Sequence, residues 1–192
     1  AAPQPPRPIL FPRPRFAAEA LGLTAAQKGT ALHLVMQFID FDKSTTKRGA
    51  AAEIQRLVRE AVITPQQGEA ADPARIAALF SSPLGRELLA SDTLQREFKF
   101  SILVPARDYY PQAGEGEEVL LQGVVDCWFE TLEGITVVDF KTDRITVEDL
   151  PARAESYRSQ LTAYSRALEE VTGRPVVRKV LWFFRLDRAV EL

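Results

Sequence analysis

Several residue types and motifs are scarce in this sequence of 192 residues, and their scarcity excludes whole classes of protein. A single cysteine, Cys127, excludes an intramolecular disulfide and an iron–sulfur cluster with four cysteine ligands within this chain. No Gly-x-x-x-x-Gly-Lys-Ser/Thr motif occurs, so we expect no ATP site in this chain. No apolar run approaches the roughly 18 residues of a membrane-spanning helix, and no signal-peptide pattern opens the sequence. We therefore expect a cytoplasmic protein without a membrane segment.

The charge balance is also close to neutral, at −2, so net charge alone does not indicate a nucleic-acid partner. The distribution is more informative, because residues 61–140 hold 13 Asp and Glu against 5 Lys and Arg. The flanking segments are richer in bases. This pattern permits a cation in the middle of the chain and phosphates at its margins, and requires neither.

The first 22 residues differ from the rest in composition. Six prolines within residues 1–14 favour an extended polyproline II segment and forbid a helix. We interpret residues 1–22 as a linker or arm, in preference to a ligand for an SH3-type module. Residues 23–192 are long enough for a single domain with its own core, which we expect to be cut from a longer polypeptide.

Hydrophobic periodicity predicts an α/β fold with a helical N-terminal part and a mixed sheet covered by helices on both faces. Thr24, with Gln27 three residues later, is the predicted start of the first helix. The predicted helices cover residues 24–41, 47–63 (ended by Pro65), 73–80, 83–89 and 147–172, and Pro151 marks a candidate break in the last one. The predicted strands cover residues 95–104, 119–129, 135–141 and 176–186.

The two strands at 119–129 and 135–141 form a predicted hairpin that carries two carboxylates. If Glu130 faces Ile135 across the turn, Asp126 lies opposite Asp139. Directly opposed side chains lie about 4.5–5.5 Å apart at Cβ, and like charges at this distance repel each other. A hard cation such as Mg²⁺ or Mn²⁺ between the two carboxylates removes this repulsion. Lys141 shares the face of Asp139 and lies at the rim of the same site. Two acids and a lysine in this arrangement suit metal-assisted hydrolysis of a phosphate ester.

Two alternatives remain open for this hairpin. The charged residues could lie on a solvated face with no metal between them, and a one-residue slip in register would separate the acids. The same alternation places Val125 and Cys127 on one face, opposite to that of Asp126.

Three polar residues elsewhere are further candidates. His33 is the only histidine, and Gly29 one helical turn before it leaves room at its side. The pattern leaves both a packing role and a site role open for His33. Gln160 could line a site or be a polar residue at the edge of the core. For Glu97, surface exposure is favoured over a role as a third acid.

Four short motifs then occur in a fixed order: G-T-A-L-H at 29–33, G-V-V-D at 123–126, V-D-F-K-T-D at 138–143 and Q-L-T-A-Y at 160–164. Together they resemble the RecB-type branch of the PD-(D/E)XK nucleases, which have a restriction-endonuclease-like fold. Within that branch, the sequence is most similar to the C-terminal nuclease domains of AddA-type helicase–nuclease subunits. The resemblance runs from about residue 23 to residue 184.

The resemblance implies roles for the residues that match its motifs. His33, Asp126, Asp139 and the main-chain carbonyl of Phe140 would bind Mg²⁺, with Mn²⁺ as a substitute. Lys141 would orient the attacking water and stabilise the charge on the scissile phosphate. Gln160 and Tyr164, together with Gly29, would support the site or the DNA backbone.

The resemblance also implies a substrate and partners. The substrate would be DNA, with a preference for single strands, and cleavage would leave 5′-phosphate and 3′-hydroxyl ends during recombinational repair of double-strand breaks. A helicase domain of the same polypeptide and a second nuclease subunit would be the partners. Phe140 stands where the family often has tyrosine, and Lys99 where it often has proline. A module of the same fold that binds DNA or docks on a partner without catalysis is the alternative function.

Overall fold

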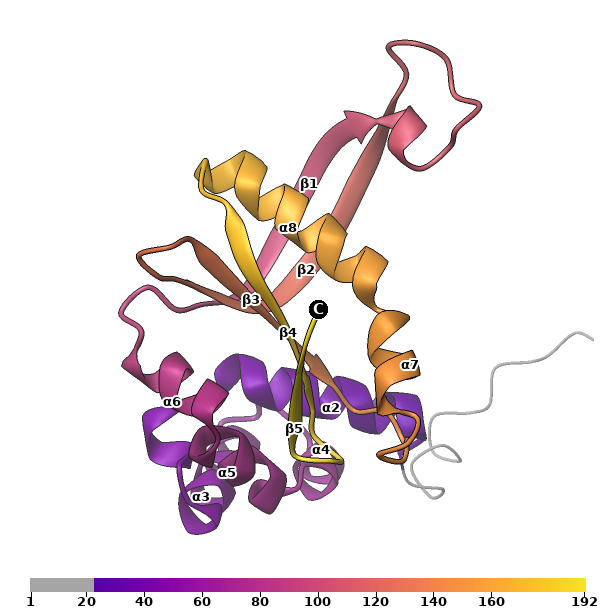
Figure 1. Ribbon diagram of the computed structural model, residues 1–192. Helices are drawn as coiled ribbons and strands as arrows, with labels where there is room; N and C mark the ends of the chain where they lie inside the picture. Colours follow the sequence, from indigo (N-terminus) through magenta and orange to yellow (C-terminus); the bar gives the residue numbers. More distant parts are fainter. Residues whose placement is uncertain (1–22) are drawn as a thin grey trace, which may run out of the picture.

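The computed structural model describes residues 23–192 and folds them into a five-stranded mixed sheet with helices on both faces (Figure 1). This confirms the predicted fold class, whereas the predicted arm over residues 1–22 lies outside the described residues. The strands are β1 (Gln95–Pro105), β2 (Glu118–Glu130), β3 (Ile135–Lys141), β4 (Val176–Phe183) and β5 (Arg188–Glu191). The helices are α2 (Ala25–Phe38), α3 (Lys47–Arg59), α4 (Pro65–Ala70), α5 (Pro73–Ser81), α6 (Pro83–Ala90), α7 (Leu150–Glu155) and α8 (Arg158–Thr172).

The strands follow the order β1-β2-β3-β4-β5 across the sheet. All neighbouring pairs are antiparallel except β3 and β4, which are parallel and are joined by α7 and α8. The strand expected over 176–186 ends at Phe183, and a fifth strand that was not predicted, β5, follows after the chain reverses around Asp187, whose φ of 50° is left-handed. Because β3 and β4 are parallel, their carboxyl ends lie side by side at the same end of the sheet.

Prolines begin helices in this chain more often than they end them. The predicted helix over 47–63 ends at Arg59, and Pro65, expected to end it, starts α4 instead. Pro151 lies in the first turn of α7, and the break before α8 falls after Glu155. Proline is tolerated in the first turn because the missing N–H has no helical partner there. Thr24 forms the predicted capping box with Gln27.

The predicted register of the β2–β3 hairpin is confirmed, since Glu130 pairs with Ile135. The pairing ends with Cys127 opposite Val138, so one further step along both strands brings Asp126 to the level of Asp139.

Strand β2 changes phase at Asp126. Val125 belongs to the core beneath α7 and α8, while Cys127 belongs to the core on the opposite face of the sheet. The expectation that these two residues share a face is therefore wrong. On the neighbouring strand, Glu97 has a left-handed φ of 54°, so both strands are distorted at the same level. Such irregularities re-aim side chains and are common next to active sites.

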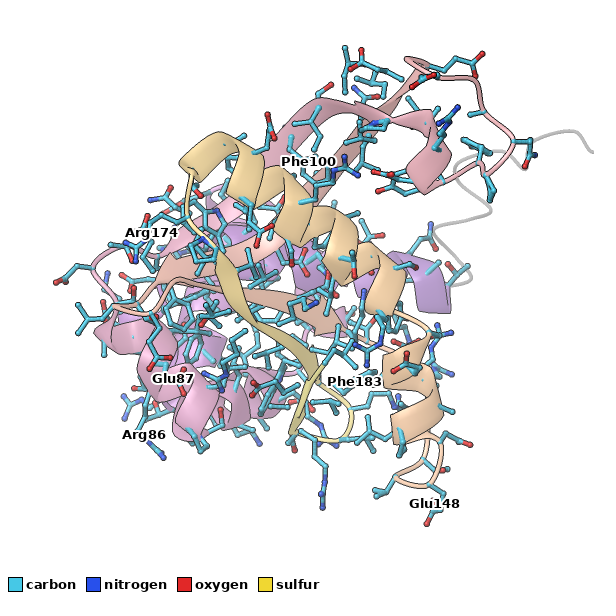
Figure 2. All side chains as sticks on the ribbon, turned by 45° about the horizontal axis from the view of Figure 1, so that its top comes forward. Arg86, Glu87, Phe100, Glu148, Arg174 and Phe183 are labelled. Atoms are coloured by element: carbon cyan, nitrogen blue, oxygen red, sulfur yellow. The ribbon has the colours of Figure 1, made fainter. Side chains whose placement is uncertain are left out.

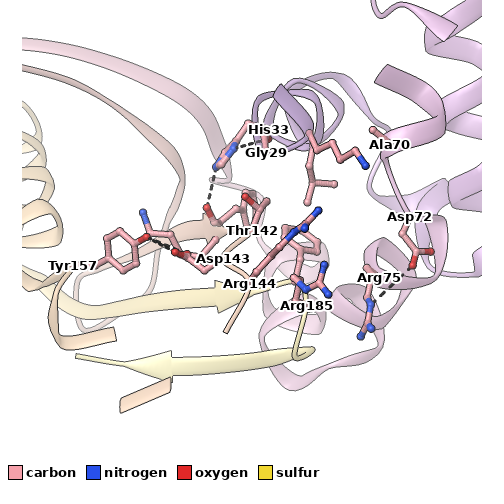
Figure 3. A pocket seen from close by; sticks show the side chains of 15 residues that line it. Gly29, His33, Ala70, Asp72, Arg75, Thr142, Asp143, Arg144, Tyr157 and Arg185 are labelled. Atoms are coloured by element: carbon pink, nitrogen blue, oxygen red, sulfur yellow. Dashed lines mark hydrogen bonds and ion pairs between the residues drawn. The ribbon is translucent and has the colours of Figure 1, made fainter. Parts of the chain in front are cut away.

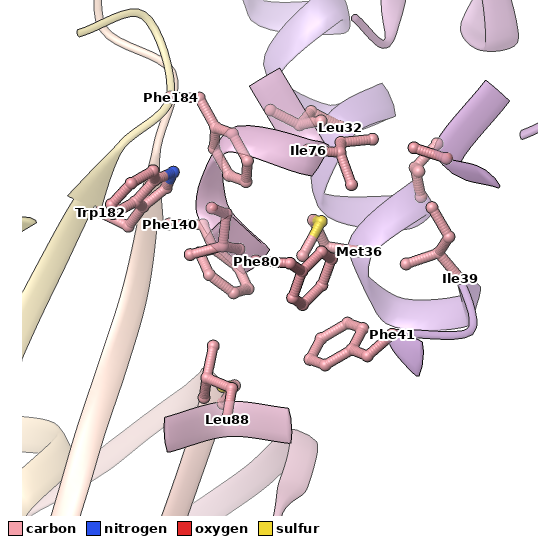
Figure 4. Close-up of a cluster of buried hydrophobic side chains, with 14 of the residues drawn as sticks. Leu32, Met36, Ile39, Phe41, Ile76, Phe80, Leu88, Phe140, Trp182 and Phe184 are labelled. Atoms are coloured by element: carbon pink, nitrogen blue, oxygen red, sulfur yellow. The ribbon is translucent and has the colours of Figure 1, made fainter. Parts of the chain in front are cut away.

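Two hydrophobic cores lie on the two faces of the sheet. One packs α2, α5 and α6 against the ends of β3 and β4 through Phe140, Trp182 and Phe184 (Figure 4). The other lies beneath α8 and contains Phe100 and Phe183, both labelled in Figure 2. Because α2 and α8 hold opposite faces, side chains from both helices meet where the strands end. No helix within residues 23–192 has the length and apolar character to cross a membrane.

Candidate metal and catalytic site

The side chain of His33 on α2 contacts Asp126 on β2 and Phe140 on β3. Its Nδ1 lies 3.1 Å from the carbonyl oxygen of Gly29, which can only accept, so Nδ1 carries a proton. Its Nε2 lies 2.9 Å from the carbonyl oxygen of Phe140 and 3.2 Å from Oδ2 of Asp126. The imidazole is thus fixed by the turn before it, with Nε2 turned toward two oxygen atoms.

The surroundings of His33 favour its protonated form. Burial alone would lower its pKa, but the hydrogen bond and negative charge of Asp126 outweigh burial, with help from the carbonyl groups of Gly29 and Phe140. Together they raise the pKa of His33 to about 9. A positive group is therefore favoured at this point among the oxygen atoms, and either a proton or a metal ion can supply it.

Asp126 and Phe140 complete this cluster. The Phe140 N–H donates to Oδ2 of Asp126 at 2.7 Å, so the carboxylate is held against the β3 backbone. Adjacent ligands of an octahedral Mg²⁺, each about 2.1 Å from the metal, lie about 3 Å apart. The distances from Nε2 to the Phe140 oxygen and to Asp126 Oδ2, 2.9 and 3.2 Å, match that spacing.

Asp139 is almost completely buried and lies beside Lys141. Its Oδ2 is 2.5 Å from Nζ of Lys141 but makes no well-oriented hydrogen bond. Burial raises the pKa of Asp139 to about 6, the charge of Asp126 adds to that effect, and Lys141 and His33 oppose it. The ammonium group of Lys141 thus balances the charge of this buried oxygen without a well-oriented hydrogen bond, which leaves the oxygen able to bind a metal ion.

Lys141 is held on three sides. Besides Asp139, its Nζ donates to Oε1 of Gln160 at 2.8 Å and lies 3.8 Å from the centroid of the Tyr157 ring. Gln160 in turn donates from Nε2 to the hydroxyl of Tyr164 at 2.7 Å. The α8 residues therefore position the ammonium group. The contact between the Tyr157 ring and Lys141 was not predicted from the sequence.

Gly29 allows α2 to approach the end of β3. A Cβ at this position would lie 2.8 Å from Oγ1 of Thr142, which is closer than side-chain carbons normally come. The absent side chain thus sets the distance between the helix of His33 and the strand of Phe140.

Glu97 lies nearer to the site than the sequence analysis expected. The pairs Arg96–Cys127 and Phe98–Val125 bracket it, which puts Glu97 opposite Asp126. It is half-buried, and its pKa is raised by burial first and by the charge of Asp126 second. The favoured interpretation as an exposed charge is wrong, and the strand register would have revealed this.

The residues present fit a hard divalent cation. Carboxylate and carbonyl oxygens together with one imidazole are suitable ligands for Mg²⁺ or Mn²⁺. Within residues 23–192, no three His, Cys, Asp or Glu side chains form a metal-binding group. Three donors converge all the same, because His33 Nε2 lies 2.9 Å from the main-chain carbonyl oxygen of Phe140 and 3.2 Å from Oδ2 of Asp126. The fourth, Asp139, is turned toward Nζ of Lys141.

The fold and this site together define a class of protein. The profile of the PD-(D/E)XK nuclease superfamily matches residues 12–191, and the chain belongs to that superfamily.

Individual relatives then narrow the comparison. The chain is 41% identical over 181 residues to an ATP-dependent helicase/nuclease subunit of Acetivibrio thermocellus, covering 92% of this chain and 14% of that protein. The proteins of the same name from Desulforamulus reducens and Moorella thermoacetica are 36% and 40% identical, over 97% and 93% of this chain and 15% and 13% of their own lengths. The resemblance to AddA-type helicase–nuclease subunits is thereby confirmed. The chain spans about one seventh of the length of these relatives.

Proposed function

We propose that this chain is a metal-dependent deoxyribonuclease domain that hydrolyses phosphodiester bonds of single-stranded DNA. The observation that carries the proposal is the convergence of His33 Nε2, Asp126 Oδ2 and the Phe140 carbonyl oxygen, at spacings of 2.9 and 3.2 Å, beside the Asp139–Lys141 pair. A site of this kind joins a cation-binding corner to a fixed positive side chain, as phosphate hydrolysis requires.

The residues have separate tasks in this proposal. His33, Asp126, Asp139 and the Phe140 carbonyl would hold Mg²⁺ or Mn²⁺, which when bound supplies a Lewis acid and makes a coordinated water more acidic. Lys141, fixed by Gln160 and by Asp139, orients the attacking water and balances the negative charge that grows on the phosphate. The water oxygen bonds to phosphorus and releases a proton to solvent while the bond to the 3′-oxygen breaks. That oxygen takes up a proton, which leaves 3′-hydroxyl and 5′-phosphate ends.

The relatives suggest the setting of this reaction. Their name joins a helicase to a nuclease, and this chain covers only a small part of each. We infer that residues 23–192 form a nuclease domain that receives single strands from a helicase domain of the same polypeptide. The same proposal includes a role in recombinational break repair, together with a second nuclease subunit.

Cleavage of end-labelled single-stranded DNA by this chain, with Mg²⁺, Mn²⁺ or EDTA, tests the function. We expect metal-dependent cleavage that is lost in Asp139→Ala and in Lys141→Ala, with a phosphate on the new 5′ ends by mass spectrometry. The matched controls are Asp92→Ala and Lys99→Ala, which remove exposed charges outside the site. Circular dichroism establishes that each variant is folded.

Mn²⁺ affinity, measured by calorimetry on the same samples, distinguishes the nuclease from the alternative of a non-catalytic module. A chain that neither cleaves DNA nor binds Mn²⁺ through Asp139 is not a metal-dependent nuclease. Such a result would favour a module of the same fold that binds DNA or docks on a partner without catalysis.

A further inference from the structure

A cavity of about 650 Å³ opens directly beside the proposed catalytic residues (Figure 3). Lys141 lines it, and His33 lies on one side of it and Arg75 on α5 on the other. Figure 3 places Arg144 and Arg185 between them. The cavity therefore continues the site away from the metal-binding corner.

The fold brings Arg144 and Arg185 to this cavity from the segments that follow β3 and β4. Lys141 pairs with Phe183 at the end of the parallel β3–β4 ladder, and the N–H of Phe184 donates to the Lys141 carbonyl at 2.9 Å. The chain segments that leave β3 and β4 are thus held together, and they carry Arg144 and Arg185. The crevice at the carboxyl ends of parallel strands is where open α/β sheets commonly bind ligands.

The positive charge in the cavity is only partly neutralised. Arg75 forms ion pairs with Asp72 and Asp187, and Asp143 accepts from Arg153 and Tyr157. In contrast, Lys28, Arg144 and Arg185 form no ion pair with any residue of the described part of the chain.

These three exposed cations, which we call the basic triad (Lys28, Arg144 and Arg185), face one cavity from three segments of the chain. Like charges gathered without counter-ions repel one another and do not stabilise the fold, so a polyanionic ligand best explains their grouping.

We propose that the basic triad binds backbone phosphates of the DNA strand next to the phosphate that is cut. This inference rests on the proposed nuclease function and names further substrate-binding residues for it. The cavity volume is in the range of pockets that hold small molecules, so we expect it to take a segment of one strand. Phosphate contacts of this kind bind without reading the base sequence.

Salt-dependent DNA binding tests this proposal without any need for cleavage. The affinity of the chain for a fluorescent 20-nucleotide oligo(dT) is measured in EDTA at several salt concentrations. Each phosphate contact to a single strand contributes about 0.7 to the slope of log affinity against log salt. We expect Lys28→Gln, Arg144→Gln and Arg185→Gln each to lower the slope by about 0.7, which is about five-fold in affinity at 0.1 M salt. The triple variant should lose about 2 from the slope and about 100-fold in affinity.

A triple variant on α3, Lys47→Gln with Arg48→Gln and Arg59→Gln, is the matched control. It removes the same charge from exposed positions outside the cavity, so its slope should change little. Equal losses in both triple variants would mean that only net charge matters, and an unchanged triad variant would mean that the cavity does not hold the strand. Either result overturns the proposal.

Two further measurements distinguish failure of the basic-triad proposal from failure of the proposed nuclease function. A duplex of the same length should bind more weakly than oligo(dT), and equal or tighter duplex binding would overturn the single-strand assignment. A chain that shows the expected slopes but never cleaves with Mg²⁺ or Mn²⁺ retains the binding cavity and loses only the proposed reaction. Cleavage with no effect of the triad variants on binding removes the cavity proposal alone.

Discussion

Substituting Gly29 by alanine should impair the site without weakening the fold. The new Cβ would lie 2.8 Å from Oγ1 of Thr142, whereas ordinary contact begins at 3.4 Å, so the neighbours must separate by about 0.6 Å. A displacement of 1 Å in a catalytic group can reduce a rate by about 100-fold, and 0.6 Å corresponds to a loss on the order of ten-fold. The affected distance is that between His33 Nε2 and the Phe140 carbonyl oxygen, now 2.9 Å. Alanine also favours the helix over glycine by about 1 kcal/mol, so the free energy of unfolding should not fall.

The assay compares Mn²⁺ affinity by calorimetry, DNA cleavage and urea denaturation for Gly29→Ala, Thr142→Ala and the double variant. Removing Oγ1 of Thr142 leaves only its Cβ, 3.9 Å from the added methyl group, which is ordinary contact. The double variant should therefore recover most of the metal affinity and cleavage. If Gly29→Ala behaves as the parent chain, Thr142 accommodates the methyl group by rotation and the steric reasoning is refuted. A loss that Thr142→Ala does not restore refutes it as well.

Three further predictions follow from the same geometry. The pKa of Asp139 is raised from its usual 3.8 to about 6 in the folded chain, which then binds more protons than the unfolded chain between these values. The free energy of unfolding without metal should therefore fall as pH rises through that interval. In EDTA, the free energy of unfolding of Asp139→Asn should be about 1–3 kcal/mol higher than that of the parent at pH ~7.5 and equal to it at pH ~3. Urea denaturation measures this, and a less stable variant at pH ~7.5 would contradict it. Burial and the charge of Asp126 raise the pKa of the fully buried Cys127 thiol. It should therefore react with Ellman's reagent at pH ~8 only after unfolding in urea, and rapid modification of the folded chain would show otherwise. Tyr157→Leu removes the ring beside Lys141 and should slow cleavage about two- to thirty-fold, since a cation–π contact contributes about 0.5–2 kcal/mol. Tyr157→Phe keeps the ring and serves as the control, and equal rates for the two variants would exclude a role for the ring.

Much of the hairpin at the centre of the site could be predicted from its own residues. The alternation on both strands and the four residues between them indicate that Glu130 faces Ile135, and the structure confirms this register, which brings Asp126 to the level of Asp139. The phase change at Asp126 could not be predicted this way. It lies at the same level as the left-handed backbone of Glu97 on the neighbouring strand, and alternation within one strand gives no information about irregularities in its partner.

Contacts between distant segments were beyond any local pattern. His33 and Phe140 are 107 residues apart in sequence, and only the packing of α2 on the sheet brings the imidazole to that carbonyl group. The motif order indicated that these segments belong to one site but not which atoms face each other. The same holds for the contact between Tyr157 and Lys141, because the sequence pattern of a helix does not show which charged side chain lies over an aromatic ring.

The sequence by itself determined the hairpin and the residue types able to hold a cation, because these depend on neighbours within a few residues. The structure decided between the expected register and a one-residue slip. Only the tertiary structure decided how Lys141 is oriented, that Glu97 lies opposite Asp126, and that Lys28, Arg144 and Arg185 line one cavity. The physical reason is that strand ends and helix faces from separate segments meet there, and their distances follow from the packing of two cores on one sheet.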